Sequence, residues 1–234
     1  GASDALRSAG FKVFGPSKAA SQLQGTKDFA EGVMRDAGVH IASGETDLMQ
    51  AEFSLCAICD GRNLIAMQPT QNFQPDGMGA YSPLPWAPDE IMEETLDKVL
   101  NPTIQEMAAR GTPFIGLLYA GLALTSRGTK VIEFNARFGD PETQVLLPRL
   151  KTPLAHLLMA AATKNLENFG ELEWSDDSAV TVVLASSGYP SDPKLGEVIT
   201  DVQTNSNSYV FHAGTEMRDG VLYSSGGRVL TVTG

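Results

Sequence analysis

Apolar and polar positions along the chain predict a mixture of buried strands and amphipathic helices. Two largely apolar stretches, 52–60 and 114–125, are typical of buried strands. A tight turn at 126–128 and an alternating stretch at 130–138 follow the second of them, which predicts a hairpin. Shorter strands are expected at 11–14, 63–69, 179–185, 209–212, 221–223 and 228–232.

Apolar residues three and four positions apart predict helices between these strands. Thr26 is placed to cap one helix and Gly38 to end it. A second amphipathic helix should begin at Pro88, because proline is favoured at the first helical position. A third should cover 141–166 with a kink or break at Pro148.

Together these elements indicate an α+β protein in which helices pack on a sheet as an α/β two-layer arrangement. After Trp174 the pattern changes to short strands separated by Gly, Ser, Asn and Asp. We therefore expect a domain boundary near residue 173, with a larger domain at 1–172 and a smaller β-rich domain at 173–234.

Composition and charge exclude several classes of protein. The chain has 234 residues, 42% hydrophobic and 19% charged, which is typical of a globular protein rather than a disordered one. Its formal net charge of −11 argues against binding to nucleic acid or to anionic membranes. No apolar run approaches the ~18–20 residues that span a bilayer. We expect a cytoplasmic protein that is a monomer or a weak homodimer.

The two cysteines, Cys56 and Cys59, have the C-x-x-C spacing of zinc and redox sites. Within a strand, however, residues three apart point to opposite faces. A zinc site would also need two more ligands, and the three histidines (His40, His156, His212) show no motif spacing. We interpret both cysteines as buried core thiols.

The stretch 130–138 carries the most informative polar residues. Alternation places Glu133, Asn135 and Arg137 on one face, and it places Ile132, Phe134, Ala136 and Phe138 on the core face. Carboxylate and amide oxygens suit Mg²⁺, and a guanidinium can hold an anion with two hydrogen bonds. The alternative is an edge strand whose polar face meets water.

A forced turn follows this strand at 139–141 and leads into a helix. We expect the turn to fix Asp140 beside Arg137. A positioned carboxylate next to a guanidinium and a pair of oxygen donors favours the ligand-binding interpretation over the edge strand.

Five segments, in order along nearly the whole chain, resemble the phosphoribosylamine–glycine ligase family, also called glycinamide ribonucleotide synthetase. The most specific of them is Arg137-Phe-Gly-Asp-Pro-Glu-Thr-Gln144, which matches the family's signature. This segment begins at 131, upstream of the signature, and the other four lie at 15–29, 77–83, 119–122 and 226–230.

This resemblance implies an ATP-grasp core with a smaller C-terminal β-rich domain. It implies a ligase of de novo purine biosynthesis that uses ATP and Mg²⁺ or Mn²⁺. ATP would phosphorylate the glycine carboxylate, and the amine of 5-phosphoribosylamine would attack the resulting glycyl phosphate. The products would be glycinamide ribonucleotide, ADP and phosphate.

The resemblance also implies roles for residues of the strand and turn. Glu133 and Asn135 match the family's metal ligands. Arg137 and Asp140 match the motif that lines the phosphoryl-transfer site, which implies that they stabilise and orient an anion.

Other matches concern the nucleotide and the amine substrate. Lys27 matches a lysine that reaches the ATP phosphates, and a solvated lysine is the alternative. Glu52 resembles the acidic residue that holds the ATP ribose. The loop Gly77-Met78-Gly79 resembles the one that closes over the amine substrate, and a simple tight turn is the alternative.

The sequence departs from the family pattern in three places. Nothing matches the family's N-terminal nucleotide-fold domain. The expected Lys-Ala-Asp-Gly strand and glycine-rich ATP lid are also missing, and in their place is a segment at 44–50 whose pattern predicts no helix or strand. The loop at 73–77 is shortened. The alternatives are therefore another ATP-grasp carboxylate–amine ligase, or a catalytically impaired nucleotide-binding remnant.

Overall fold

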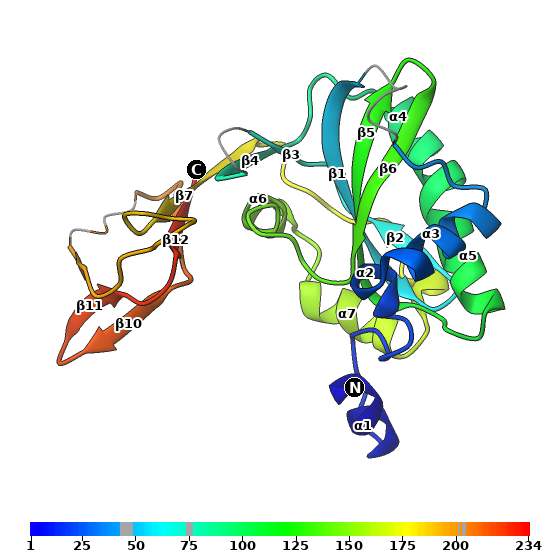
Figure 1. Cartoon of the computed structure of the whole chain (residues 1–234), viewed down its shortest axis with the longest axis horizontal. Coiled ribbons are helices and arrows are strands. Elements are labelled where there is room, and N and C mark those ends of the chain that lie inside the picture. The colour runs from blue at the N-terminus through cyan, green and yellow to red at the C-terminus, as the bar shows by residue number, and fades with distance from the viewer. Residues whose placement is uncertain (43–48, 74–76, 201, 203–204) are drawn as a thin grey trace.

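The computed structural model of the chain describes residues 1–42, 49–73, 77–200, 202 and 205–234. The segment at 44–50, for which no element was predicted, and the shortened loop at 73–77 thus fall largely outside the described residues. Figure 1 shows a larger lobe, in which helices surround a sheet, and a smaller lobe made of strands. Among the described residues, no helix is long and apolar enough to cross a membrane.

The larger lobe is built on a four-stranded antiparallel sheet with the order β2-β1-β5-β6. β1 and β5 pair along nearly their whole length, from Met49–Thr125 to Asp60–Ile115. The predicted hairpin of β5 and β6 is confirmed. The strands are β1 (Met49–Asp60), β2 (Leu64–Ala66), β5 (Ile115–Thr125) and β6 (Gly128–Asn135).

Helices cover both faces of this sheet. On one face lie α2 (Gln22–Gly25), α3 (Lys27–Asp36), α4 (Asp89–Thr95), the π-helical turn η1 (Leu96–Leu100) and α5 (Asn101–Ala109). On the other lie α6 (Thr143–Leu146), the 3-10 turn η2 (Leu147–Arg149), α7 (Leu154–Ala162) and the 3-10 turn η3 (Leu166–Asn168). The mixed α+β class is confirmed, and α6 and α7 add a second helical layer to the one expected.

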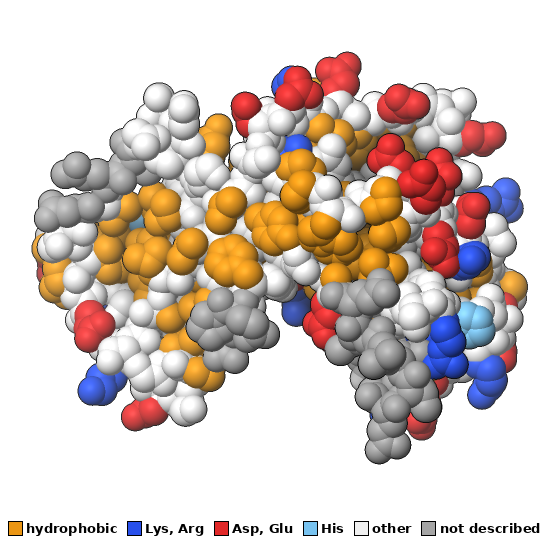
Figure 2. All heavy atoms as spheres, turned by 90° about the horizontal axis from the view of Figure 1, so that it is seen from above, with side chains coloured by type: hydrophobic (Ala, Val, Ile, Leu, Met, Phe, Trp, Pro, Cys, Tyr) orange, Lys and Arg blue, Asp and Glu red, His pale blue; other side chains and the backbone are white. Residues whose placement is uncertain are grey.

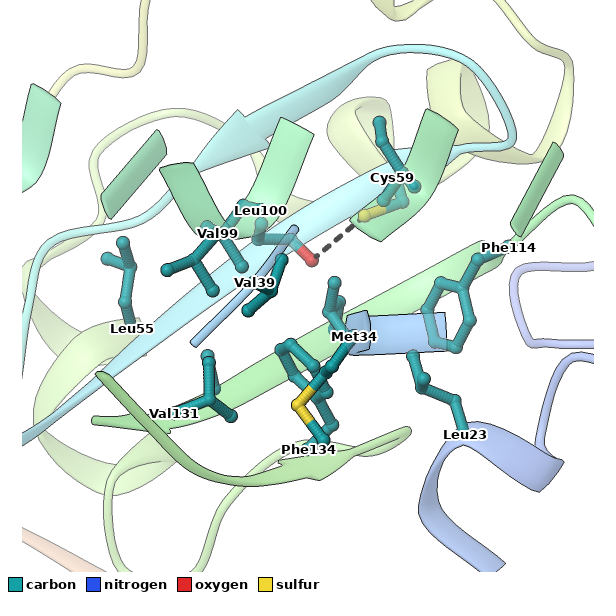
Figure 3. Packing of buried hydrophobic residues seen from close by; sticks show 14 of the residues in the cluster. Leu23, Met34, Val39, Leu55, Cys59, Val99, Leu100, Phe114, Val131 and Phe134 are labelled. Carbon is teal, nitrogen blue, oxygen red and sulfur yellow. Dashed lines mark hydrogen bonds between the residues drawn. The ribbon is translucent and has the colours of Figure 1, made fainter. Parts of the chain in front are cut away.

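Burial on both faces explains why β1 and β5 are apolar at nearly every position. Leu55 and Cys59 of β1 pack with Val99 and Leu100 in one cluster, which Figure 3 shows. Cys56 belongs to the cluster on the opposite face. The prediction of two separate, buried thiols is confirmed, and burial raises the pKa of both.

The alternation expected along 130–138 was wrong in two respects. β6 ends at Asn135, and Phe138 packs against the cluster on the opposite face from Phe134.

Within β6, Ile132 is also misplaced. Gly121 of β5 pairs with Glu133, but its neighbour Leu122 pairs with Val131, so Ile132 is an extra residue that forms a β-bulge. Val131 therefore takes the core position, and Ile132 is 43% exposed. The bulge turns Ile132 to the same side as Glu133.

The segment at 11–14 is not a strand, contrary to expectation. It pairs with no other strand in the described part of the chain, and Phe11 is 63% exposed. Extended segments need a partner to satisfy their backbone groups. Here the side chain of Arg7, from the helix α1 (Ala2–Ser8), instead donates hydrogen bonds to the carbonyls of Val13 and Gly15.

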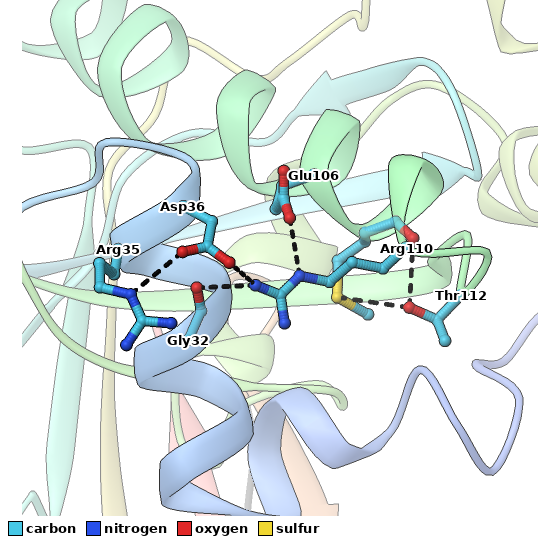
Figure 4. A network of polar contacts seen from close by, with 7 residues as sticks. Gly32, Arg35, Asp36, Glu106, Arg110 and Thr112 are labelled. Carbon is cyan, nitrogen blue, oxygen red and sulfur yellow. Dashed lines mark hydrogen bonds and ion pairs between the residues drawn. The ribbon is translucent and has the colours of Figure 1, made fainter.

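A polar network holds α3 against α5 (Figure 4). The guanidinium of Arg110 donates to the Gly32 carbonyl over 2.9 Å and to Glu106 over 2.7 Å, and it pairs with Asp36. It also lies 5.8 Å from the centre of the Phe29 ring. Because these contacts join two helices through one side chain, they fix the position of α3 on the sheet.

The smaller lobe contains a five-stranded sheet, β3-β4-β7-β12-β9, and a three-stranded sheet, β10-β11-β8. Two strands of the larger sheet, β3 and β4, come from residues before the expected boundary. The strands are β3 (Gln71–Asn72), β4 (Gly79–Ser82), β7 (Ala179–Ala185), β8 (Val198–Ile199), β9 (Tyr209–His212), β10 (Thr215–Arg218), β11 (Val221–Ser224) and β12 (Arg228–Thr233).

Arg149 joins the two lobes. Its buried guanidinium donates to the carbonyls of Asp177 (2.6 Å) and Ser175 (3.1 Å), which directly precede β7. It also donates to the Ser82 hydroxyl of β4 over 3.0 Å and to the amide oxygen of Gln68. Seen from above, the molecule has a notch between the lobes (Figure 2).

Candidate functional site

The end of β6, the turn that follows it and the first residue of β12 surround a hollow of about 230 Å³. We call it the main hollow. Glu133, Asn135 and Arg137 all line it, as does Asp140. The structure thus brings Glu133 and Asn135 of β6, and Arg137 just beyond its end, to one concave site, together with the carboxylate of Asp140.

Glu133 and Asn135 offer two oxygen donors to this hollow. The Asn135 amide nitrogen donates to Glu133 Oε1 over 2.8 Å, which holds the two side chains together. A carboxylate and an amide oxygen suit a hard cation that keeps several waters and binds substrate phosphates, as Mg²⁺ does. Among the described residues, no three Asp, Glu, His or Cys side chains group as metal ligands. The two oxygen donors fit a cation whose remaining ligands would be water and substrate oxygens.

Asp140 pairs with a different arginine from the one expected. Its carboxylate lies 3.4 Å from Arg228 Nη1 and accepts a 2.7 Å hydrogen bond from Gln144. Arg137 is exposed and donates over 3.0 Å to the Phe138 carbonyl. The expectation that Asp140 is fixed beside Arg137 is therefore corrected: both line the main hollow, but Arg228 holds Asp140.

Arg228 was not identified as a site residue from the sequence. Besides the Asp140 carboxylate, it contacts the Asp140 carbonyl (2.8 Å) and the Tyr189 hydroxyl (3.1 Å). Burial lowers its pKa, but the hydrogen bond with Tyr189 and the charge of Asp140 outweigh burial and raise it. The arginine is therefore a fixed positive charge on the wall formed by the smaller lobe. The Gly226-Gly227-Arg228 motif is the feature of the sequence that could have indicated Arg228 as a site residue.

A chain of hydrogen-bonded polar side chains, in which Glu142, Tyr119 and Ser54 are buried and Asn72 is exposed, forms the floor of the main hollow, and sequence reasoning missed it. Glu142 Oε1 accepts hydrogen bonds from the Tyr119 hydroxyl (3.0 Å) and the Asn72 amide (2.9 Å). Tyr119 in turn lies 2.6 Å from the Ser54 hydroxyl. Burial, followed by the charge of Glu142, raises the pKa of Tyr119, so its hydroxyl stays a donor. The signal for Glu142 was its place within the octet 137–144.

Glycine is required at position 139 because Glu142 fills the space of a side chain there. A Cβ at Gly139 would lie 2.4 Å from Glu142 Oε2. Any other residue would displace this carboxylate or the turn that carries it.

Of the loop residues Gly77, Met78 and Gly79, the first lines the main hollow and the other two contact or belong to the sheet of the smaller lobe. Gly77 has a φ of +65° and lines the main hollow. The Met78 carbonyl accepts a hydrogen bond from the Val183 amide over 2.8 Å, so this residue extends the pairing of β4 with β7. Gly79 is explained by packing, because a Cβ there would lie 2.1 Å from the Phe73 ring.

Glu52 and Ile132 line a second hollow of about 230 Å³, the side hollow, which Glu133 also borders. Glu133 thus faces both. Lys27, in contrast, is 87% exposed in the first turn of α3, 3.7 Å from Glu31, and it lines neither hollow. The structure brings Glu52 to the site and leaves Lys27 outside it.

Comparisons with known proteins identify relatives of this chain. Residues 17–143 match the family model "Phosphoribosylglycinamide synthetase, ATP-grasp (A) domain", and residues 179–234 match its "C domain". The chain is 45% identical to a phosphoribosylamine–glycine ligase of Streptomyces coelicolor, covering all of this chain and 73% of the relative. It is 38% identical to that of Mycobacterium leprae, covering 99% and 72%.

A solved structure has a similar fold. The crystal structure of phosphoribosylamine–glycine ligase from Thermotoga maritima superposes with a TM-score of 0.82 at 22% identity, over 95% of this chain and 74% of that one. The alignment with the Streptomyces relative spans 302 positions, although this chain has 234 residues, so the relative has residues that this chain lacks. The chain belongs to the phosphoribosylamine–glycine ligase family.

Proposed function

We propose that the chain catalyses the ATP-dependent joining of glycine to 5-phosphoribosylamine in purine biosynthesis. A glycine carboxylate oxygen attacks the γ-phosphorus of ATP and ADP leaves. The amine nitrogen of 5-phosphoribosylamine then attacks the acyl carbon, phosphate leaves, and the nitrogen loses a proton. The observation that carries this proposal is the convergence of Glu133, Asn135 and Arg137 on the main hollow of a member of this family.

The main hollow has the charges that phosphoryl transfer needs. Arg137 and Arg228 border it from opposite lobes, and both can stabilise the negative charge that develops on the moving phosphoryl group. Asp140 orients Arg228 through their ion pair. We assign Arg137 to anion stabilisation and Asp140 to orientation.

Glu133 and Asn135 would hold the divalent metal, Mg²⁺ or Mn²⁺. A bound metal supplies charge neutralisation to the phosphate oxygens. Because Glu133 borders both hollows, we assign the side hollow to the nucleoside of ATP. There Glu52 can accept hydrogen bonds from ribose hydroxyls, and the bulge exposes Ile132 as an apolar surface for a base.

The remaining assignments rest on the family resemblance. Lys27 would have to move toward the hollows to reach ATP phosphates, because its side chain points into solvent here. Gly77, Met78 and Gly79 would lie over the amine substrate. We further propose that the protein acts in the cytoplasm as a monomer or weak homodimer, with small-molecule partners only. Along the sequence we place the domain boundary after residue 172, with β3 and β4 of the first domain completing the sheet of the second.

The test is ADP release by the purified chain, measured with and without glycine and 5-phosphoribosylamine. Release should require both substrates. Glu133→Gln keeps the size of the side chain but removes a charged metal ligand, so it should lower turnover by roughly 100-fold or more and raise the metal concentration needed. Glu171→Gln is a matched control, because Glu171 is exposed and lines neither hollow.

Other outcomes would redirect the assignment. ATP binding without turnover would favour a nucleotide-binding remnant, and turnover with another carboxylate in place of glycine would favour a different ligase. Unchanged turnover in Glu133→Gln would contradict the assignment of Glu133 as a metal ligand.

A further inference from the structure

The carboxylate of Glu142 is a buried negative charge without a cationic partner among the described residues. The residue is 3% exposed. Its Oε1 accepts from two neutral groups, the Tyr119 hydroxyl and the Asn72 amide. No donor in the described part of the chain reaches Oε2, although Glu142 lines the main hollow. A buried charge of this kind is costly unless a ligand neutralises it.

The other two carboxylates of the hollow are already engaged. Asp140 pairs with Arg228 and accepts from Gln144. Glu133 accepts from Asn135, and these two provide the oxygen donors for a metal. Glu142 is therefore the carboxylate that remains for a second cationic group.

That cationic group could be a metal ion or an organic ammonium. Among the described residues, Glu142 does not combine with two other acidic, histidine or cysteine side chains into a metal-binding group. Tyr119 and Asn72 both donate to Oε1, which leaves a single oxygen, Oε2, for the ligand. One available oxygen in a small hollow suits a primary ammonium better than a metal, which needs several oxygen ligands.

We propose that Glu142 binds the α-ammonium group of glycine, an inference that rests on the proposed function. The amino acid then lies in the main hollow with its two ends matched to opposite charges. Its ammonium lies at the Glu142 floor, and its carboxylate faces Arg137 and the metal-binding pair. Glu142 thereby selects an α-amino acid over a carboxylic acid that has no ammonium group.

Glu142→Gln tests this role, because it keeps the shape and an acceptor for Tyr119 and Asn72 while removing the charge. The KM for glycine should rise about 10- to 100-fold, whereas the KM values for ATP and 5-phosphoribosylamine should change less than about threefold. Glycolate, which has a hydroxyl in place of the ammonium, should be used as a competing substrate. The preference for glycine over glycolate should fall by at least about tenfold.

Two further variants separate binding from folding. Glu142→Asp keeps the charge and should give an intermediate KM for glycine with the preference over glycolate largely retained. Glu171→Gln should match the wild type in all constants. Thermal unfolding of each variant shows whether it is folded, and equilibrium dialysis with labelled glycine in the presence of a non-hydrolysable ATP analogue measures binding without turnover.

The possible results are distinct. Absence of glycine-dependent ADP release in the wild type would contradict the proposed function, and dialysis would then decide the role of Glu142 alone. An unchanged glycine KM or binding constant in folded Glu142→Gln would overturn the ammonium assignment. So would a shift confined to the Mg²⁺ activation constant, because that result would make Glu142 a metal ligand.

Discussion

The Tyr119 hydroxyl donates a 3.0 Å hydrogen bond to Oε1 of Glu142, and so connects the central strand β5 to the turn that precedes α6. Tyr119 is itself held from β1 by the Ser54 hydroxyl. The floor of the main hollow is therefore fixed by two strands of the core. Its walls come from the end of β6, from the turn that follows it and from Arg228 of the smaller lobe.

Tyr119→Phe should destabilise the protein by about 1–2 kcal/mol, because the buried Glu142 carboxylate loses one of its two donors. Urea unfolding measures the change. Tyr209→Phe is the matched control: Tyr209 is 53% exposed, and its loss of a hydroxyl should change stability by less than about 0.5 kcal/mol. Equal effects in the two variants would show that the hydroxyl of Tyr119 contributes nothing to stability.

Arg149→Met should cost about 3 kcal/mol of stability, because it leaves the Ser175 and Asp177 carbonyls and the Ser82 hydroxyl without a buried donor. The same substitution at Arg35, whose side chain is 77% exposed, should be nearly neutral. Urea unfolding compares the two. If Arg149→Met unfolds at the same urea concentration as Arg35→Met, the hydrogen bonds between the lobes do not stabilise the fold.

Asp60 should make stability depend on pH on the acid side. Burial raises its pKa, but hydrogen bonds from Asn63, Arg62 and Leu166 outweigh burial and hold the pKa below its ordinary value. A lowered pKa in the folded state stabilises the protein above the unfolded-state pKa of ~3.9, and this contribution is lost as the pH falls through the folded-state pKa.

Asp60→Asn should therefore lower stability at pH 7 and flatten its decline below about pH 4. Thermal unfolding from pH 7 to pH 2.5 measures both effects. Asp97→Asn, at an exposed position of η1, is the control and should keep the wild-type curve. Parallel curves for wild type and Asp60→Asn would contradict the assignment.

Much of the fold could be predicted where a segment's own pattern decides its structure. The bounds of β7 and β9 agree with those expected from alternation and turn residues. The hairpin of β5 and β6 was recognisable from its turn. Ile132 was misplaced because a bulge arises from the pairing of two strands, which a single strand does not reveal. Likewise, 11–14 has the composition of a strand but lacks a partner.

The candidate site could be predicted only along one strand and its turn. Glu133 and Asn135 share a face of β6 by local alternation and line one hollow, whereas Arg137 lines it from beyond the end of the strand. Asn72 and Tyr119 could not be found in this way, because they reach Glu142 from segments 70 and 23 residues away. Their convergence depends on strand order and on the smaller lobe, neither of which is a local property.

The pairing of β3 and β4 with β7 has a practical consequence for dividing the molecule. A cut after residue 172 would separate β4 from the neighbour to which it is hydrogen-bonded, and β7 would become an open edge able to recruit strands from other molecules. Fragments intended for separate expression should therefore keep 71–82 together with 179–234.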